Sequence, residues 1–270
     1  MYEAELRAII EAGKEASQEV LTIYKHGFNV KIKEDQSPVT DADIASDKIL
    51  RKHFSAFSDV AYLSEEEADD LSRLKKEALF IVDPLDGTAD YVNRDGTFGI
   101  NIAFVVHHEP VVSMICVPAK QTFAYAVKGR GSYYVDEEGR ETRMHVSDKK
   151  DHLIALVSKT HLLPEEEDVL KFHQDKIEKA VASGASTKAI MLAMGKGDLS
   201  IRFTDQTKEW DVCAPDLVVR EAGGVFTDSK LKPFTYNRKD VYNHDGYSMF
   251  NNIENTSLLR SYLDAKKVSK

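Results

Sequence analysis

The sequence predicts a fold of two lobes, in which an α+β lobe precedes an α/β lobe. Three observations indicate this order. Two helical patterns open the chain, a run of β-type segments follows, and short apolar segments then alternate with helical ones. A polar stretch without periodicity, residues 148–152, separates the last two patterns. We therefore expect an N-terminal lobe over residues 1–150 and a C-terminal lobe over residues 151–270.

The N-terminal lobe begins with helices. Apolar residues recur at helical spacing over residues 2–25, and Gly27 ends this helix. A polar loop over residues 31–38 leads to a second helix over residues 41–57. The acidic segment 62–70 is expected to be the end of a strand that runs into a loop.

The remainder of this lobe is rich in β-type segments. Apolar runs bounded by turn residues predict three consecutive strands, over residues 98–106, 111–117 and 122–127. Glu109 and Pro110 are expected to connect the first two of these. Glycines at positions 129, 131 and 139 indicate a further hairpin.

The C-terminal lobe alternates between the two kinds of element. Strands are expected at residues 154–158, 177–181 and 199–203, and helices at residues 164–172, 186–194 and 211–221. Gly223 and Gly224 end the last helix. This order resembles repeated βαβ units.

Composition narrows the functional class. The chain has 270 residues, 42% of them hydrophobic and 30% charged, and a net charge of -9. That charge argues against a nucleic-acid binder, which needs a basic face. Cys116 and Cys213 are flanked by apolar residues and are expected to be buried thiols, which fits a reducing cytosol. No apolar run reaches membrane-spanning length, and the charged N-terminus is no signal sequence. We expect a soluble cytoplasmic protein.

One segment carries most of the chemistry. Residues 81–88, Ile-Val-Asp-Pro-Leu-Asp-Gly-Thr, bring two carboxylates to the end of an apolar run. Carboxylate oxygens suit Mg²⁺, and a helix that starts after Gly87 would offer its first N–H groups to an anion. The alternative is an ordinary strand-to-helix turn with Asp as cap and Gly for its backbone angle. Taken alone, the two interpretations are about equal.

Three other acidic segments have similar alternatives. Residues 64–67 (Ser-Glu-Glu-Glu) fit a solvated turn or a capping box better than a ligand site. Residues 40–43 (Thr-Asp-Ala-Asp) fit a capping box, or a carboxylate that orients a hydroxyl or a water. Asp211 fits a helix cap, and Trp210, the only tryptophan, fits a packing anchor.

Together these segments resemble one family. Residues 83–88 resemble the first signature of the inositol monophosphatase superfamily, whose members are lithium-sensitive, Mg²⁺-dependent phosphatases. Trp210-Asp211-x-x-Ala214 followed by residues 221–224 is similar to its second signature, and residues 63–66 are similar to its glutamate segment. The resemblance implies a layered αβαβα sandwich with most metal ligands in the N-terminal lobe.

The resemblance also implies roles for particular residues. Two or three Mg²⁺ ions are expected, and their implied ligands are Glu65, Asp83, the Leu85 carbonyl, Asp86 and Asp211. Asp83 would bridge two ions, and a weaker third ion would lie near Glu65. Thr88, oriented by Asp43, would position the attacking water, and the amides of Gly87 and Thr88 would hold the phosphate.

The substrate is less strongly specified. Residues 36–45, which begin at Gln36, and the positions of Lys188 and Arg202 are similar to those of the 3′(2′),5′-bisphosphate nucleotidase branch. A physical reason for Lys188 and Arg202 in a nucleotidase is the second phosphate of its substrate, which needs its own cations. The alternative is that Lys188 and Arg202 are surface charges. Ser186 and Lys208 are also expected to border the pocket.

The sequence therefore predicts an enzyme that removes the 3′(2′)-phosphate from bisphosphonucleosides such as phosphoadenosine phosphate. The alternatives are an inositol or sugar-phosphate phosphatase, or a catalytically silent protein that binds a phosphorylated ligand. No membrane or nucleic-acid polymer partner is expected, and the chain is expected to be a monomer or a homodimer.

Overall fold

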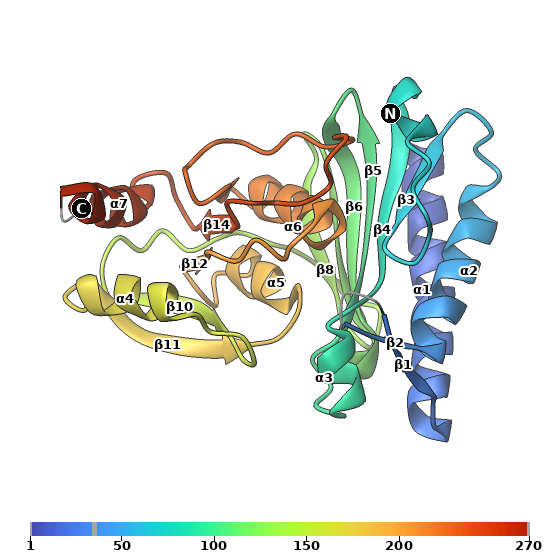
Figure 1. The fold of residues 1–270 in the computed structure, drawn as a ribbon, viewed down its shortest axis with the longest axis horizontal. Helices are drawn as coiled ribbons and strands as arrows, with labels where there is room; N and C mark the ends of the chain where they lie inside the picture. Colours follow the sequence, from blue (N-terminus) through green and yellow to red (C-terminus); the bar gives the residue numbers. More distant parts are fainter. Residues whose placement is uncertain (1, 34–36, 269–270) are drawn as a thin grey trace.

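Helices and sheets alternate in five layers (Figure 1). The computed structural model describes residues 2–33 and 37–268. Helices α1 (Glu3–His26) and α2 (Asp41–Phe54) cover one face of a seven-stranded sheet. Helices α5 (Thr187–Ala193) and α6 (Glu209–Glu221) lie between that sheet and a five-stranded sheet, which α4 (Pro164–Phe172) and α7 (Thr256–Val268) cover from outside. This confirms the predicted layered αβαβα sandwich.

The seven-stranded sheet is formed by consecutive strands. Their order is β3 (Ala61–Ser64), β4 (Ala78–Asp86), β5 (Gly99–Val106), β6 (Glu109–Val117), β7 (Thr122–Val127), β8 (Gly131–Val135) and β9 (Glu141–Arg143). Only β3 and β4 run parallel. The prediction that Glu109 and Pro110 form a connection is wrong, because both belong to β6. The turn lies instead at His107 and His108, which both have positive φ.

The five-stranded sheet is mixed. Its order is β11 (Ile177–Ser183), β10 (Leu153–Ser158), β12 (Leu199–Arg202), β14 (Tyr247–Phe250) and β13 (Val225–Thr227). Strand β10 runs parallel to β11 and β12, as the alternating pattern predicted, whereas β14 runs antiparallel to both of its neighbours. The sequence did not predict β13, β14 or α7.

Smaller elements complete the chain. They are β1 (Val30–Ile32), β2 (Pro38–Thr40), the short helix α3 (Thr88–Val92) and two 3₁₀ turns, Ser72–Lys75 and Pro118–Lys120. Strands β1 and β2 pair antiparallel where a plain loop was predicted. Gln36, cited above for its similarity to nucleotidases, lies outside the described residues.

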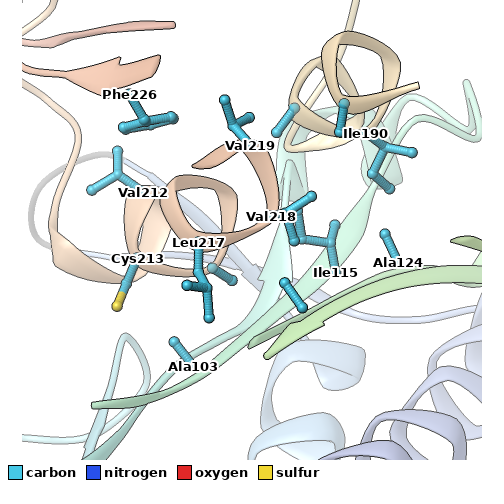
Figure 2. Packing of buried hydrophobic residues seen from close by; sticks show 14 of the residues in the cluster. Ala103, Ile115, Ala124, Ile190, Val212, Cys213, Leu217, Val218, Val219 and Phe226 are labelled. Carbon is cyan, nitrogen blue, oxygen red and sulfur yellow. The ribbon is translucent and has the colours of Figure 1, made fainter. Parts of the chain in front are cut away.

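Three apolar clusters fill the interfaces between layers. One joins α1 and α2 to the seven-stranded sheet and contains Cys116, and another lies under α4 and α7. The middle cluster packs α5 and α6 on the other face of that sheet, and Figure 2 shows Cys213 and Leu217 of α6 in it. Both thiols are buried, as predicted, and Trp210 belongs to the middle cluster. Burial of each large apolar side chain contributes about 1.5–3 kcal/mol, so α6 is held firmly against the sheet.

Helix α6 therefore joins the two halves of the sequence: it belongs to the second half but packs on the seven-stranded sheet, which the first half forms. Among the helices that the structure describes, none is long and apolar enough to cross a membrane.

Candidate active site

A β-bulge brings the first two carboxylates together. Asp83 lies opposite Asn101 of β5, whereas Asp86 lies opposite Gly99, so β4 has one extra residue between the two pairs. Side chains alternate faces along a regular strand, which would place Asp83 and Asp86 on opposite faces. The extra residue places them on the same side. Pro84 fits at this position because proline has no backbone N–H, and a residue in a bulge need not donate a hydrogen bond to the neighbouring strand.

The third carboxylate comes from the first turn of α6. Asp211 is the third residue of the helix and accepts a hydrogen bond from the Lys208 N–H at 2.6 Å, so it closes the helix start without being the N-cap. One ligand oxygen from each of Asp83, Asp86 and Asp211 lies within 4.8 Å of the other two. We call these three residues the carboxylate cluster.

Burial makes this cluster electrostatically unfavourable by itself. Asp83 is 1% exposed, and its burial together with the charges of Glu65, Asp86 and Asp211 raises its carboxyl pKa well above the usual range. Removal from water, with the charges of Glu65 and Asp86, raises the pKa of Asp211 in the same way. Like charges held this close disfavour ionisation unless a cation lies between them.

Three donors orient Asp86. Its Oδ2 accepts hydrogen bonds from the Ser186 amide at 2.7 Å, from the Ser186 hydroxyl, and from the Asn101 side-chain amide at 3.2 Å. The Asn101 amide also donates to the Ser186 hydroxyl oxygen at 2.7 Å. With Oδ2 engaged in this way, Oδ1 is left for a ligand. Ser186, predicted to border the substrate, thus contacts a residue of the carboxylate cluster.

Thr88 and Asp43 meet across α3 and α2. The Thr88 hydroxyl lies 3.0 Å from Asp43 Oδ1 and 3.1 Å from the Leu85 carbonyl oxygen, either of which can accept its proton. Asp43 Oδ2 accepts from the backbone and hydroxyl of Thr40. The two interpretations of residues 40–43 therefore hold together, since one carboxylate oxygen caps α2 and the other faces Thr88.

The turn before α3 requires glycine. Gly87 has φ +84°, and a Cβ there would lie 3.3 Å from the Cβ of Ala185. This close approach brings the turn after β4 against the loop before α5. Helix α3 then begins at Thr88, as the motif predicted.

Glu65 lies beside the carboxylate cluster but is not one of the three residues in it. Its carboxylate pairs with Lys33 Nζ at 3.1 Å, and Lys33 also pairs with Glu66 at 2.7 Å. Burial raises the pKa of Glu66 to about 7 against the opposing effect of Lys33. Ser64 ends β3 and residues 65–67 form a turn with no helix after it. Of the two expectations for residues 64–67, the turn agrees with the structure and the capping box is wrong.

A cavity beside the carboxylate cluster is lined by two buried cations. Lys188 on α5 is 6% exposed and Arg202 at the end of β12 is 8% exposed. Both border the same cavity as Asp86 and Gly87. The alternative that Lys188 and Arg202 are surface charges is therefore wrong. We call these two residues the cationic pair.

The two members of the cationic pair are held differently. Lys188 Nζ donates to the carbonyl oxygens of Ala185 at 3.0 Å and Ser183 at 3.4 Å, and burial lowers the Lys188 pKa to about 8. Arg202 Nη1 pairs with buried Glu166 at 2.7 Å and donates to the His161 carbonyl at 2.7 Å. Fixed in this way, both side chains face the cavity without large rearrangement.

Lys208 is beside Asp211, but its side chain does not line this cavity, in contrast to the prediction. Its ammonium is 5.2 Å from the ring centre of Trp210 and 5.3 Å from that of Tyr242, a cation–π geometry, and it is absent from the residues that line the cavity.

Several residues of the site were missed by sequence reasoning. They are Lys33, Asp90, Asn101, His161 and Glu166. Only Asn101 carried a local signal, as a polar residue in the middle of the apolar run of β5. Asp90 lies on α3 directly after the motif and gave no separate signal, whereas Lys33, His161 and Glu166 face the site because distant segments fold together.

Comparison with known proteins places this arrangement in a family. The sequence matches the inositol monophosphatase family over residues 1–261. The chain belongs to this family. The predicted resemblance and the prediction that the chain is an enzyme of this phosphatase family are confirmed. Family members are metal-dependent and act on small phosphorylated substrates, in agreement with the carboxylate cluster.

Within the family, nucleotidases are among the most similar relatives. The chain is 27% identical over 248 residues to the 3′(2′),5′-bisphosphate nucleotidase CysQ of Aggregatibacter actinomycetemcomitans, covering 90% of this chain and 91% of that protein. It is 28% identical to CysQ of Escherichia coli K12, covering 90% and 98%. The crystal structure of CysQ from Bacteroides thetaiotaomicron superimposes with a TM-score of 0.81 at 31% identity, covering 92% and 97%. The nucleotidase branch that the sequence resembles is therefore among these similar relatives.

Proposed function

We propose that this protein is a Mg²⁺-dependent phosphomonoesterase that removes the 3′(2′)-phosphate of 3′(2′),5′-bisphosphonucleosides such as phosphoadenosine phosphate. The observation that carries the proposal is the cationic pair. Lys188 and Arg202 line the same cavity as Asp86 and Gly87, where a substrate with one phosphate would have no use for two further buried cations. The similarity to CysQ proteins supports the same substrate class.

The residues present fit Mg²⁺. The carboxylate cluster offers only oxygen atoms, which hard divalent cations prefer. Its raised pKa values are the expected property of a group that a cation completes. We assign Asp83, Asp86 and Asp211 as ligands, with Glu65 and the Leu85 carbonyl beside them, for two or three ions. When bound, such ions lower the pKa of water and neutralise charge on the phosphate.

The chain's own residues orient the reacting groups. The Thr88 hydroxyl donates to Asp43 or to the Leu85 carbonyl, so the lone pairs of the Thr88 oxygen can accept a hydrogen bond from the attacking water. Attack by that water on phosphorus forms the new P–O bond and breaks the bond to the sugar oxygen; the water gives up one proton, and the sugar oxygen takes up one proton and leaves as a hydroxyl. We propose that the Gly87 and Thr88 amides hold the phosphate during this step.

The remaining assignments divide the site between the two lobes. Residues 1–150 supply most of the proposed metal ligands, and residues 151–270 supply the cationic pair that reads the second phosphate. Arginine presents a fork of donors and lysine a point charge, and both suit a phosphate. Ser186 acts on this assignment by orienting Asp86.

A phosphate-release panel tests the proposal. Adenosine 3′,5′-bisphosphate, adenosine 5′-monophosphate and inositol 1-phosphate are compared in Mg²⁺ and in excess EDTA. We expect the highest kcat/KM with the bisphosphate, release of its 3′-phosphate, and loss of activity in EDTA. Equal or faster hydrolysis of inositol 1-phosphate would replace the nucleotidase assignment with an inositol phosphatase. Unchanged turnover in EDTA would contradict the metal assignment.

A further inference from the structure

Asp90 is a carboxylate of the cavity that the proposed chemistry does not use. It lies on α3, one helical turn after Asp86, and lines the cavity with Gly87 and Lys188. The residue is only 4% exposed. It is not one of the carboxylate cluster, which is the group of potential metal ligands found among the described residues.

Neither carboxylate oxygen of Asp90 has a hydrogen-bond donor among the residues that the structure describes. Its Oδ1 is enclosed without a partner. Its Oδ2 lies 2.5 Å from the position that a Cβ would take on Gly184, so the loop before α5 passes over it as bare backbone. A buried polar group without a partner costs free energy, and a buried charge costs more. Such an arrangement is expected where a ligand supplies the donor.

The neighbouring carboxylate shows the contrast. Asp95 accepts hydrogen bonds from the backbone and hydroxyl of Thr97 at 2.8 and 2.6 Å and pairs with Lys159 at 2.8 Å. Protein donors therefore satisfy the Asp95 carboxylate, five residues further along the chain. Within the described residues, the Asp90 carboxylate has no such donor.

We propose that Asp90, through Oδ2, accepts a hydrogen bond from the free sugar hydroxyl next to the phosphate that is removed. The proposal rests on the proposed function, because in a nucleoside 3′,5′-bisphosphate the 2′-hydroxyl is the only sugar hydroxyl left free. Asp90 follows Gly87 and Thr88 by two or three residues on the same short helix. A group that meets it must therefore be bonded close to the phosphate, which favours the sugar over the more distant base. Asp90 is thus a specificity residue for ribose over deoxyribose.

The test compares adenosine 3′,5′-bisphosphate with its 2′-deoxy analogue, in wild type and in Asp90→Ala. We expect wild type to prefer the ribose substrate by about 10- to 100-fold in kcat/KM, the size expected when a hydrogen bond to a charged group is lost. In Asp90→Ala the preference falls to about threefold or less, through loss of activity on the ribose substrate. Asp95→Ala is the matched control and keeps the wild-type ratio.

The ratio separates recognition from a general defect, because misfolding lowers both rates together. An unchanged ribose preference in Asp90→Ala would overturn the proposal. The same substrates can be compared with adenine or with unsubstituted purine as the base. If the loss of kcat/KM in Asp90→Ala depends on the exocyclic amine of adenine rather than on the 2′-hydroxyl, the proposal is also overturned. The melting temperature of Asp90→Ala without substrate is expected at or above that of wild type, because the variant removes an unpartnered buried carboxylate. A clear drop would show that protein contacts hold Asp90, and would contradict the argument.

Failure of the proposed function gives a different result. Wild type would then leave both bisphosphates intact while hydrolysing another phosphomonoester. The Asp90→Ala comparison is in that case made with inositol 1-phosphate, which has hydroxyls beside its phosphate, against phenyl phosphate, which has none. Selective loss on inositol 1-phosphate supports the hydroxyl contact, and equal loss on both overturns it.

Discussion

The carboxylate cluster and the cationic pair lie around one cavity but are built in opposite ways. Asp83, Asp86 and Asp211 are like charges held together, and within the described residues none of the three forms an ion pair with lysine or arginine. The cationic pair already has partners in the chain, since Arg202 forms an ion pair with Glu166 and Lys188 donates to two carbonyl oxygens. Within the described residues, the chain provides no counterion for the carboxylate cluster, whereas it provides hydrogen-bond partners for the cationic pair.

This difference separates two parts of the proposed function, which are turnover and the choice of substrate. On the proposed assignment, ions from solution complete the carboxylate cluster, and we expect activity to depend on their concentration. The cationic pair is held by protein contacts before the substrate arrives, so we expect it to select among substrates without needing an ion. Changes in the cluster should abolish turnover on every substrate, and changes in the cationic pair should alter the choice of substrate.

Asp86→Asn should have the largest effect. The side chain keeps its size but loses a charge that we assign to metal binding. Metal ions contribute several kcal/mol of transition-state stabilisation, so we expect kcat/KM to fall about a thousandfold or more on every phosphate ester. Asp59→Asn, at a fully exposed carboxylate, is the control and should match wild type. Unchanged Mg²⁺-dependent turnover in Asp86→Asn would show that the cluster is not the metal site.

Lys188→Met should change the choice of substrate while leaving turnover at the carboxylate cluster intact. Methionine fills much of the same space without the charge, so the second phosphate loses one cation. We expect kcat/KM for adenosine 3′,5′-bisphosphate to fall about 10- to 100-fold, the range of a charged hydrogen bond, with little change on inositol 1-phosphate. Exposed Lys179→Met is the matched control. An equal loss on both substrates would remove the nucleotidase assignment.

The carboxylate cluster was more predictable from sequence than its surroundings. Asp83 and Asp86 lie three residues apart, so one local bulge brings them together. The motif predicted a turn in this segment, and the bulge itself is seen only in the structure. The Asp211 segment carries its own helix-start pattern. Local spacing and turn chemistry are visible in a sequence, and here they specify much of the chemistry.

The burial of the cationic pair was not predictable in this way. Arg202 meets Glu166 across 36 residues, and Asn101 reaches Ser186 across 85. Such contacts depend on how elements far apart in the sequence pack together, which no local pattern encodes. For the same reason β14 was missed, since it is a four-residue strand recognisable only by its pairing with β12 and β13.

Ser186→Ala should weaken the cluster more mildly. It removes the hydroxyl that donates to Asp86 Oδ2, while the Ser186 backbone amide still donates. Residues that orient metal ligands affect metal affinity by about 10- to 100-fold, and with one donor retained we expect about a tenfold rise in the Mg²⁺ concentration for half-maximal activity. Ser183→Ala, whose hydroxyl contacts Thr187 instead, is the control. A rise in substrate KM at unchanged Mg²⁺ dependence would assign Ser186 to the substrate side.

The smallest effect should be a pH dependence carried by the cationic pair. Burial lowers the pKa of Lys188 to about 8, so its charge is present below that pH and is lost as the pH rises through it. The protonated fraction of such a group falls about fourfold between pH 7 and pH 8.5. We expect kcat/KM for the bisphosphate, divided by that for inositol 1-phosphate, to fall by about the same factor in the free enzyme.

Dividing by a substrate that does not use Lys188 cancels the titration of the metal site, of Glu66 and of the scissile phosphate. In Lys188→Met the ratio should be low and independent of pH over this range. The same decline in Lys188→Met as in wild type would assign the titration to another group. A ratio that stays constant in wild type would mean that Lys188 keeps its charge in the free enzyme, because the nearby carboxylates of Asp86, Asp90 and Glu166 hold the proton in place.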